Sequence, residues 1–190
     1  DVVELTQHSL QLHYLSVDNE EGFPGNLHVY ITYTLENTDL IINYEATTDK
    51  ATIINLTNHA YFNLNGEGQG MIHDHRLQVF SSEYIPYDDK AVPLGSVVTV
   101  LGTPMDMREG IIISDRINEP FFAVGLGIDN GWALPGWNKN EKALQLAAIL
   151  EGGGRRMETW TTFPCMQIYS GNYIESHRGK SGELYAPQCA

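Results

Sequence analysis

Two alternating runs near the start of the chain constrain its fold more than any other feature. In residues 27–35 apolar side chains occupy the odd positions, and in residues 40–46 they occupy the even positions. A period of two is typical of a strand with one buried face. The residues between the runs, 36–39 (Glu-Asn-Thr-Asp), favour a tight reversal. The sequence therefore predicts an antiparallel hairpin.

The rest of the chain also favours short strands. Glycine and proline mark loops at residues 65–70, 135–136 and 152–154, and only residues 108–118 have the character of a short helix. We find no internal repeat and no linker. Many short strands separated by turns predict an all-β fold, a large antiparallel β-sandwich or a barrel, in one domain spanning residues 1–190. Further strands are expected at 52–57, 76–80, 96–100, 143–150, 157–162 and 166–170.

The charge of the chain limits its partners. The 190 residues include 11 Lys and Arg against 24 Asp and Glu, a net charge of −13. Such a surface repels nucleic acids and anionic membranes, whereas a neutral sugar experiences no such repulsion. No apolar run approaches the roughly 20 residues of a membrane-spanning helix. We expect Cys165 and Cys189 to be free thiols of a cytoplasmic protein.

The segment Asn58–Leu64 combines polar and aromatic side chains. If it is a strand running into a turn, His59, Tyr61 and Asn63 share one face. Sugars are bound by planar polar groups that contact hydroxyls and by aromatic rings that pack on C–H faces. The alternative, a buried histidine whose ring nitrogens are satisfied within the protein, fits the residues equally well.

Two weaker signals have plainer interpretations. His73-Asp74-His75 would place two imidazoles on one face of a strand, but no third ligand is nearby, so we expect no metal. Trp160 is expected in the core, and either Trp132 or Trp137 at the rim of a pocket.

The segment Asn58–Leu64 resembles the Asn-His-x-Tyr-Phe-Asn-Leu signature of the aldose 1-epimerases at every fixed position. Other segments resemble the same family in the same order, so the similarity extends from about Ser16 to Tyr185. They are Gly22-Phe23-Pro24-Gly25, Tyr84-Ile85-Pro86, Pro93-Leu94-Gly95, Gly102 to Asp106, Gly127-Ile128-Asp129 and Thr161 to Asn172.

The resemblance implies a galactose mutarotase-like supersandwich and an isomerase that interconverts the α and β anomers of free hexoses such as galactose or glucose. By this resemblance His59 is the general acid that protonates the ring oxygen. Tyr61, Asp129 and Gln167 correspond to residues of the sugar site. The implied reaction is acid–base ring opening and needs no cofactor.

The chain also departs from the family pattern. The segment that carries the catalytic glutamate and the N-terminal part of the family pattern do not occur in residues 1–190. We therefore expect an aldose 1-epimerase-like domain incomplete at both ends, or a non-catalytic carbohydrate-binding or structural relative that has lost the base. A relative acting on hexose 6-phosphates would need cationic groups, for which Arg76, Arg155 and Arg156 are the candidates.

Overall fold

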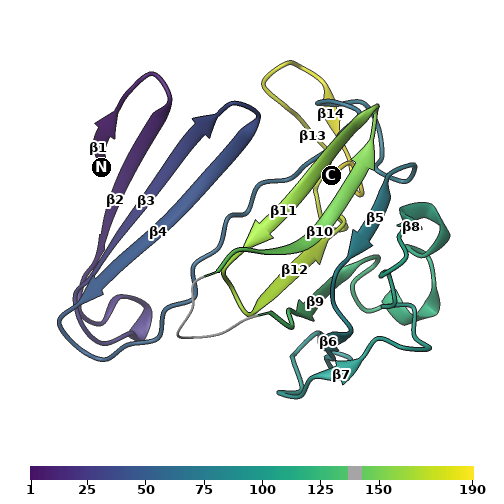
Figure 1. Cartoon of the computed structure of the whole chain (residues 1–190), viewed down its shortest axis with the longest axis horizontal. Helices are drawn as coiled ribbons and strands as arrows, with labels where there is room; N and C mark the ends of the chain where they lie inside the picture. The colour runs from purple at the N-terminus through teal and green to yellow at the C-terminus, as the bar shows by residue number, and fades with distance from the viewer. Residues whose placement is uncertain (137–142) are drawn as a thin grey trace. The chain divides into compact units, whose positions relative to one another are not determined.

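The computed structural model describes residues 1–136 and 143–190, and antiparallel strands dominate it. It divides into two compact units, Asp1–His59 (unit 1) and Ala60–Ala190 (unit 2). Figure 1 shows the elements of each, coloured by residue number. The all-β prediction is confirmed, while the expectation of one domain over residues 1–190 stays a prediction. None of the helical segments in the described ranges has the length and apolar character of a membrane span.

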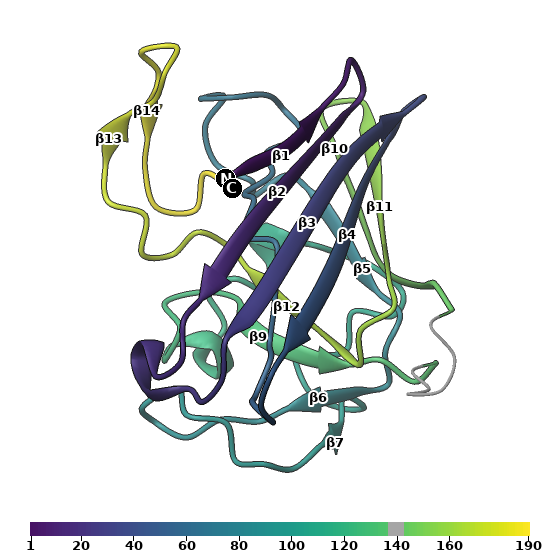
Figure 2. The same cartoon turned by 90° about the vertical axis from the view of Figure 1, so that its left-hand side faces the viewer.

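Unit 1 is a four-stranded antiparallel sheet with its strands in sequence order. Figure 2 shows this sheet with neighbouring strands side by side. A short 3-10 turn, η1 (Glu20–Gly22), lies in the connection after the second strand. The strands are β1 (Val2–Leu5), β2 (Ser9–Ser16), β3 (Leu27–Glu36) and β4 (Asp39–Thr48).

The predicted hairpin is confirmed as β3 and β4. Their register runs without interruption from Leu27 opposite Thr48 to Glu36 opposite Asp39. The reversal is tighter than expected, since only two residues lie between the strands. Asn37 has a φ of 55°, in the left-handed region that asparagine tolerates better than most residues. The alternating runs therefore place their apolar positions on one shared face.

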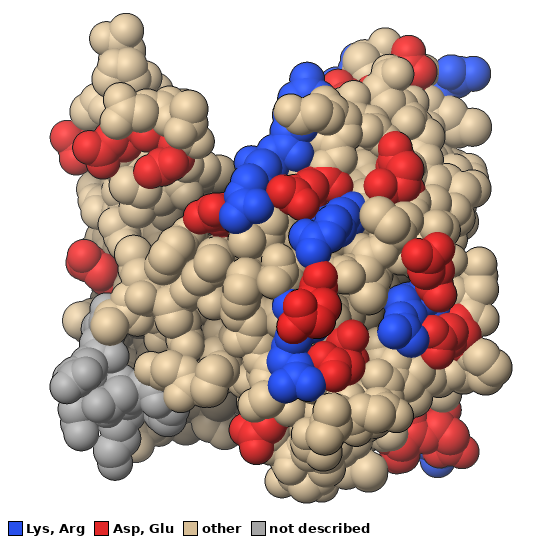
Figure 3. All heavy atoms as spheres, turned by 45° about the vertical axis from the view of Figure 1, so that its right-hand side comes forward, with Lys and Arg blue, Asp and Glu red and all other residues tan. Residues whose placement is uncertain are grey.

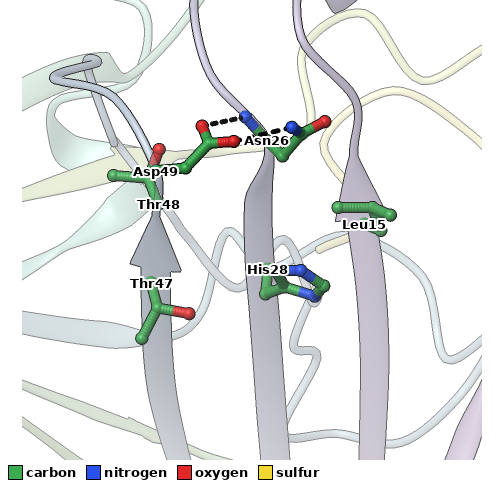
Figure 4. Close-up of a pocket in the computed structure, with 6 residues that line it drawn as sticks. All are labelled: Leu15, Asn26, His28, Thr47, Thr48 and Asp49. Atoms are coloured by element: carbon green, nitrogen blue, oxygen red, sulfur yellow. Dashed lines mark hydrogen bonds between the residues drawn. The ribbon is translucent and has the colours of Figure 1, made fainter.

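A polar network joins the two chain segments at the open end of this hairpin, opposite its turn. The Asn26 backbone N–H donates to Asp49 Oδ1 and its side-chain amide donates to Asp49 Oδ2, each at 2.7 Å. Figure 4 shows these bonds at the edge of an open depression of about 360 Å³, which His28 and Thr47 also line. Lys50 Nζ lies 2.7 Å from Asp18 Oδ2. These bonds connect the chain on both sides of η1 to the end of β4.

In its described residues, unit 2 contains two four-stranded sheets and a small hairpin, all antiparallel. The first sheet, in the order β11-β10-β5-β8, consists of β5 (Arg76–Val79), β8 (Ile111–Ile112), β10 (Gln145–Gly152) and β11 (Arg155–Thr161). The second, in the order β12-β9-β6-β7, consists of β6 (Glu83–Ile85), β7 (Val98–Thr99), β9 (Asp129–Ala133) and β12 (Cys165–Tyr169). The hairpin pairs β13 (His177–Arg178) with β14 (Leu184–Tyr185), and the 3-10 turns are η2 (Ile113–Asp115) and η3 (Pro120–Phe122).

The core of unit 2 lies among these sheets and the 3-10 turns. Trp132 is fully buried and donates its indole N–H to the Met105 carbonyl at 3.2 Å. Of the two tryptophans considered for the rim of a pocket, Trp132 is therefore excluded. Its neighbours in the core include Val79, Val100, Met105, Met107, Ile117, Phe122 and Ile128.

Other sequence expectations are corrected. Residues 52–57 form no strand, and Ile53 is 77% exposed there. The prediction failed because β-branched residues favour a strand only where a partner strand is present. Residues 108–118 form the two-residue strand β8 and the three-residue turn η2 instead of the expected short helix. Trp160 is 52% exposed on the edge strand β11, where its indole N–H donates to Glu158, so its predicted burial is wrong. Trp137 lies outside the described residues.

The remaining predicted strands are confirmed with shifted ends. The run 96–100 shortens to β7, and β10, β11 and β12 match 143–150, 157–162 and 166–170 to within about two residues. Gly153 and Gly154 form the two-residue turn between β10 and β11, with φ of 54° and 71°. Positive φ at both turn residues suits the twist of a hairpin, which explains the glycine pair.

We expect Trp132→Phe to lower the free energy of unfolding by about 1–3 kcal/mol, because the buried Met105 carbonyl loses its donor. The matched control is Trp160→Phe at an exposed position, for which we expect a change within about 0.5 kcal/mol. Urea unfolding followed by circular dichroism measures both. Equal losses from the two variants would contradict the packing described for Trp132.

The polar network at the open end of the hairpin should make the stability of unit 1 decrease at acidic pH. The Lys50 ammonium lowers the pKa of the Asp18 carboxyl, and hydrogen bonds from Asn26 lower the pKa of Asp49. A carboxyl with a lowered pKa in the folded state adds stability above its unfolded pKa of about 3.9, and this stability is lost as pH falls through the folded pKa. NMR titration of both carboxyls should give values below that reference. Values at or above it would show that the network does not form in solution.

Candidate functional site

The pairing of β9 with β12 determines which predicted site residues meet. Asp129 lies opposite Tyr169, and Gly131 lies opposite Gln167. Because side chains alternate along a strand, these four residues share one face of the pair. Trp132 lies on the opposite face, toward the core. The register of the pair therefore determines both the face that carries the site and the face that packs in the core.

Asp129 and Gln167 are directly bonded. The Gln167 side-chain N–H donates to Asp129 Oδ1 at 2.8 Å. A carboxamide has two N–H hydrogens and an acceptor oxygen, so this bond leaves one hydrogen and the oxygen for a ligand. Gly131 provides the space beneath the amide, since a Cβ at that position would lie 3.1 Å from Gln167 Oε1. The arrangement can both donate to hydroxyl groups and accept from them.

Aromatic rings border this polar pair. The rings of Tyr61 and Tyr169 meet edge to face with centroids 5.9 Å apart, and the Tyr173 backbone N–H donates to the Tyr169 hydroxyl at 2.6 Å. Burial raises the pKa of the Tyr169 phenol, and the neighbouring Tyr61 and Asp129 add to the rise. Burial likewise raises the pKa of Tyr87, and Asp129 contributes there too. Both phenols therefore stay protonated at neutral pH and can donate hydrogen bonds.

A buried network fixes the start of β9. The Ser170 hydroxyl accepts from the Ile128 backbone N–H at 3.0 Å. The Asn172 side-chain amide donates to the carbonyls of Gly125 and Ile128 at 2.8 and 3.0 Å. Ser170 and Asn172 are both buried. The residue before Asp129 is thus held by hydrogen bonds, which limits where the Asp129 carboxylate can lie.

His59 is solvent-exposed and is the last residue of unit 1, in a segment without regular structure. Tyr61, Asp129 and Gln167 belong to unit 2, where contacts with Tyr169 and between Asp129 and Gln167 connect them. The expectation that His59, Tyr61 and Asn63 share one strand face is wrong, because residues 51–63 form no strand. The placement of His59 beside the other three stays a prediction.

The histidine pair His73 and His75 does not lie on a strand, which corrects that expectation. His75 is fully buried, whereas His73 Nε2 lies 2.7 Å from Gln188 Oε1. Within the described ranges, no group of three or more His, Cys, Asp or Glu side chains is arranged to hold a metal ion.

The three arginines considered for phosphate binding already contact protein oxygens. Arg76 and Arg156 both form ion pairs with Glu151, and Arg156 also contacts Glu158. Arg155 donates to the Leu64 carbonyl at 2.6 Å. On the face drawn in Figure 3, Lys and Arg side chains lie among Asp and Glu rather than in a basic patch.

Sequence reasoning did not identify Tyr87, Gly131, Tyr169 and Tyr173 as part of this region. The signal for Tyr169 was present, because it lies two residues after Gln167 and must share its face if the segment is a strand. Gly131 could be recognised only from the register between β9 and β12, which the sequence does not display.

Curated relatives match most of the chain. Human galactose mutarotase is 37% identical over 177 residues, covering 93% of this chain and 50% of the relative. Aldose 1-epimerase of Escherichia coli K12 is 35% identical over 175 residues, covering 90% of this chain and 49% of the relative. The chain therefore spans about half the length of the curated relatives it matches.

Solved structures give the same fold. An aldose epimerase homologue from C. elegans has a TM-score of 0.84 at 24% identity, over all of this chain and 56% of that one. Galactose 1-epimerase from Lactobacillus acidophilus has a TM-score of 0.76 at 30% identity, over 90% of this chain and 50% of that one. These likenesses confirm the fold class expected from the sequence. A sequence model described as Aldose 1-epimerase matches residues 1–189, and the chain belongs to that family.

Proposed function

We propose that this chain forms the sugar-binding part of an aldose 1-epimerase that interconverts the α and β anomers of a free hexose such as galactose or glucose. The observation that carries the proposal is the Gln167–Asp129 hydrogen bond of 2.8 Å beside the Tyr61–Tyr169 edge contact. Together these side chains offer donors, acceptors and aromatic carbon to one ligand. Such a combination suits a hexose, which has hydroxyls around its ring and C–H groups on its faces.

The proposed chemistry is proton transfer at both ends of the C1–O5 bond. His59 gives a proton to the ring oxygen while a carboxylate base takes the proton of the anomeric hydroxyl, which opens the ring to the aldehyde. Rotation about C1–C2 and reclosure give the other anomer. Histidine suits the acid role because its ordinary pKa of about 6.5 lies near working pH. In the family this base is a glutamate, in a segment that does not occur in residues 1–190.

Asp129 and Gln167 orient the sugar in this proposal and do not transfer protons. A positioned substrate keeps C1 and O5 at fixed distances from acid and base, which is a large part of a catalytic advantage. Tyr61 and Tyr169 pack on the sugar face and exclude water from one side. The net charge of −13 and the ion-paired arginines favour a neutral hexose over its phosphate. We also propose a cytoplasmic location, with which the two free cysteines are consistent.

Polarimetry on freshly dissolved α-D-galactose, with an enzyme that carries this chain together with the family's glutamate segment, tests the reaction. We expect His59→Ala to slow enzyme-dependent mutarotation by about 10²-fold or more, because a general acid contributes that much. His8→Ala, another exposed histidine, is the matched control and should keep the wild-type rate. A His59→Ala variant as fast as wild type would refute the acid assignment. Sugar binding seen by NMR without any acceleration would favour the non-catalytic alternative.

Gln167→Met separates binding from chemistry. Methionine keeps the length of the side chain but cannot hydrogen-bond to Asp129 or to a hydroxyl. We expect KM for galactose to rise about two- to tenfold with a smaller change in kcat, the usual effect of losing one such bond. Gln78→Met on β5, whose amide donates to the Arg108 carbonyl, is the matched control. An unchanged KM would remove Gln167 from the sugar site.

A further inference from the structure

Leu64, the last residue of the signature segment, is held through its backbone by a buried histidine. The Leu64 N–H donates to His75 Nε2 at 2.9 Å, and His75 Nδ1 lies 2.9 Å from Asp74 Oδ1. Because Nε2 accepts from an N–H and Nδ1 faces a carboxylate, His75 is the neutral tautomer with its hydrogen on Nδ1. His75 is fully buried, and the contacts at both ring nitrogens hold the orientation of its ring. The proposed reaction assigns no proton transfer to this imidazole.

The hydrogen bonds around Leu64 form a closed ring. The Asn65 side-chain amide donates to both oxygens of Asp74, at 3.0 and 3.1 Å, and the Asn65 backbone N–H donates to Asn63 Oδ1 at 2.9 Å. The bond from Asn65, followed by that from His75, lowers the pKa of the Asp74 carboxyl. Asp74 is therefore ionised at neutral pH and keeps His75 in the tautomer that accepts from Leu64.

The other side of the same residue is held by Arg155. Its guanidinium donates to the Leu64 carbonyl at 2.6 Å. The hairpin turn at Gly153 makes this approach possible, since a Cβ there would lie 2.4 Å from the Leu64 carbonyl oxygen. Gly152 does the same for the imidazole, because a Cβ at 152 would lie 2.6 Å from His75 Cδ2. Gly152 and Gly153 thus allow the close approach, and Arg155 provides the hydrogen bond, at the same residue, Leu64.

Leu64 is close in sequence to two of the proposed site residues. Leu64 follows Tyr61 by three residues and His59 by five, and residues 51–63 lie outside any strand or helix. A backbone ladder does not fix this segment, so side chains that hold its end restrict where the preceding residues can go.

We propose that Asp74, His75 and Arg155 are positioning residues of the enzyme: they fix the backbone of Leu64 and so restrict the place of Tyr61, three residues before it. The role of these residues in catalysis rests on the proposed function, whereas their effect on Leu64 does not. His75 therefore acts through the Leu64 peptide and takes no part in proton transfer to the sugar.

Two substitutions at position 75 separate its two nitrogens. His75→Gln places an amide oxygen near the position of Nε2 and keeps an acceptor for Leu64, whereas His75→Asn keeps only a group near Nδ1. We expect the Leu64 amide hydrogen to exchange with solvent at least about tenfold faster in His75→Asn than in wild type, and within about threefold of wild type in His75→Gln. Exchange at Ile149 in β10 should stay unchanged in both. His73→Asn, the same change two residues away, is the matched control.

Mutarotation kinetics on the same variants test the catalytic half. We expect kcat to fall about tenfold in His75→Asn and to be largely restored in His75→Gln, since only the first loses the acceptor. A purely structural role would make both variants equally poor. Equal Leu64 exchange in the two variants would overturn the proposal even if the enzyme is active. An enzyme that carries this chain together with the family's glutamate segment, yet shows no mutarotase activity, would instead refute the proposed function and leave the exchange result standing.

Arg155 gives a test that does not depend on the buried ring. Arg155 is exposed, so Arg155→Met should fold, and Arg155→Lys keeps a donor for the Leu64 carbonyl. We expect kcat to fall at least about threefold in Arg155→Met and less in Arg155→Lys. Arg156→Met, at the adjacent exposed arginine that pairs with Glu151 and Glu158, is the control and should keep the wild-type kcat. Equal kcat values for wild type and Arg155→Met would remove Arg155 from the positioning set.

Discussion

The antiparallel pairing of β9 with β12 determines both faces of the candidate sugar site at once. Its register sends Trp132 into the core and leaves Asp129 and Gln167 on the opposite face, where they bond to each other. A shift of one residue would exchange the two faces, exposing the largest core side chain and burying a carboxylate. The burial of Trp132 therefore keeps the polar pair in place. Core packing and the proposed sugar recognition depend here on the same hydrogen-bond ladder.

The sequence predicted well where alternation continued over many residues. The runs at 27–35 and 40–46 predicted β3 and β4 closely, because a one-sided apolar pattern of this length fits only a half-buried strand. The strand prediction failed for residues 52–57, where the composition is typical of a strand but no partner strand pairs with them. Trp160 was misplaced for a related reason, since its exposure depends on β11 lying at a sheet edge. Pairing partners are properties of the fold and cannot be read locally.

The candidate site was predictable in part. Tyr61, Asp129 and Gln167 came from resemblance to a family signature, and the contacts within unit 2 give them a physical setting. The function of Gly131 and of the buried His75 was not predictable, because each depends on residues distant in sequence. The sequence showed His75 only as one of a histidine pair for which no metal was expected, and did not show that its two nitrogens contact Leu64 and Asp74.

The small size of residue 131 has an evolutionary consequence. A Cβ at 131 would lie 3.1 Å from Gln167 Oε1, so any larger residue there requires the amide to shift by a few tenths of an ångström. Such a shift would redirect the polar atoms of Gln167 and, in the proposed function, its contacts with the sugar. Ligand preference within such a lineage can therefore change through replacements at 131 as well as at 167, across one rung of the sheet.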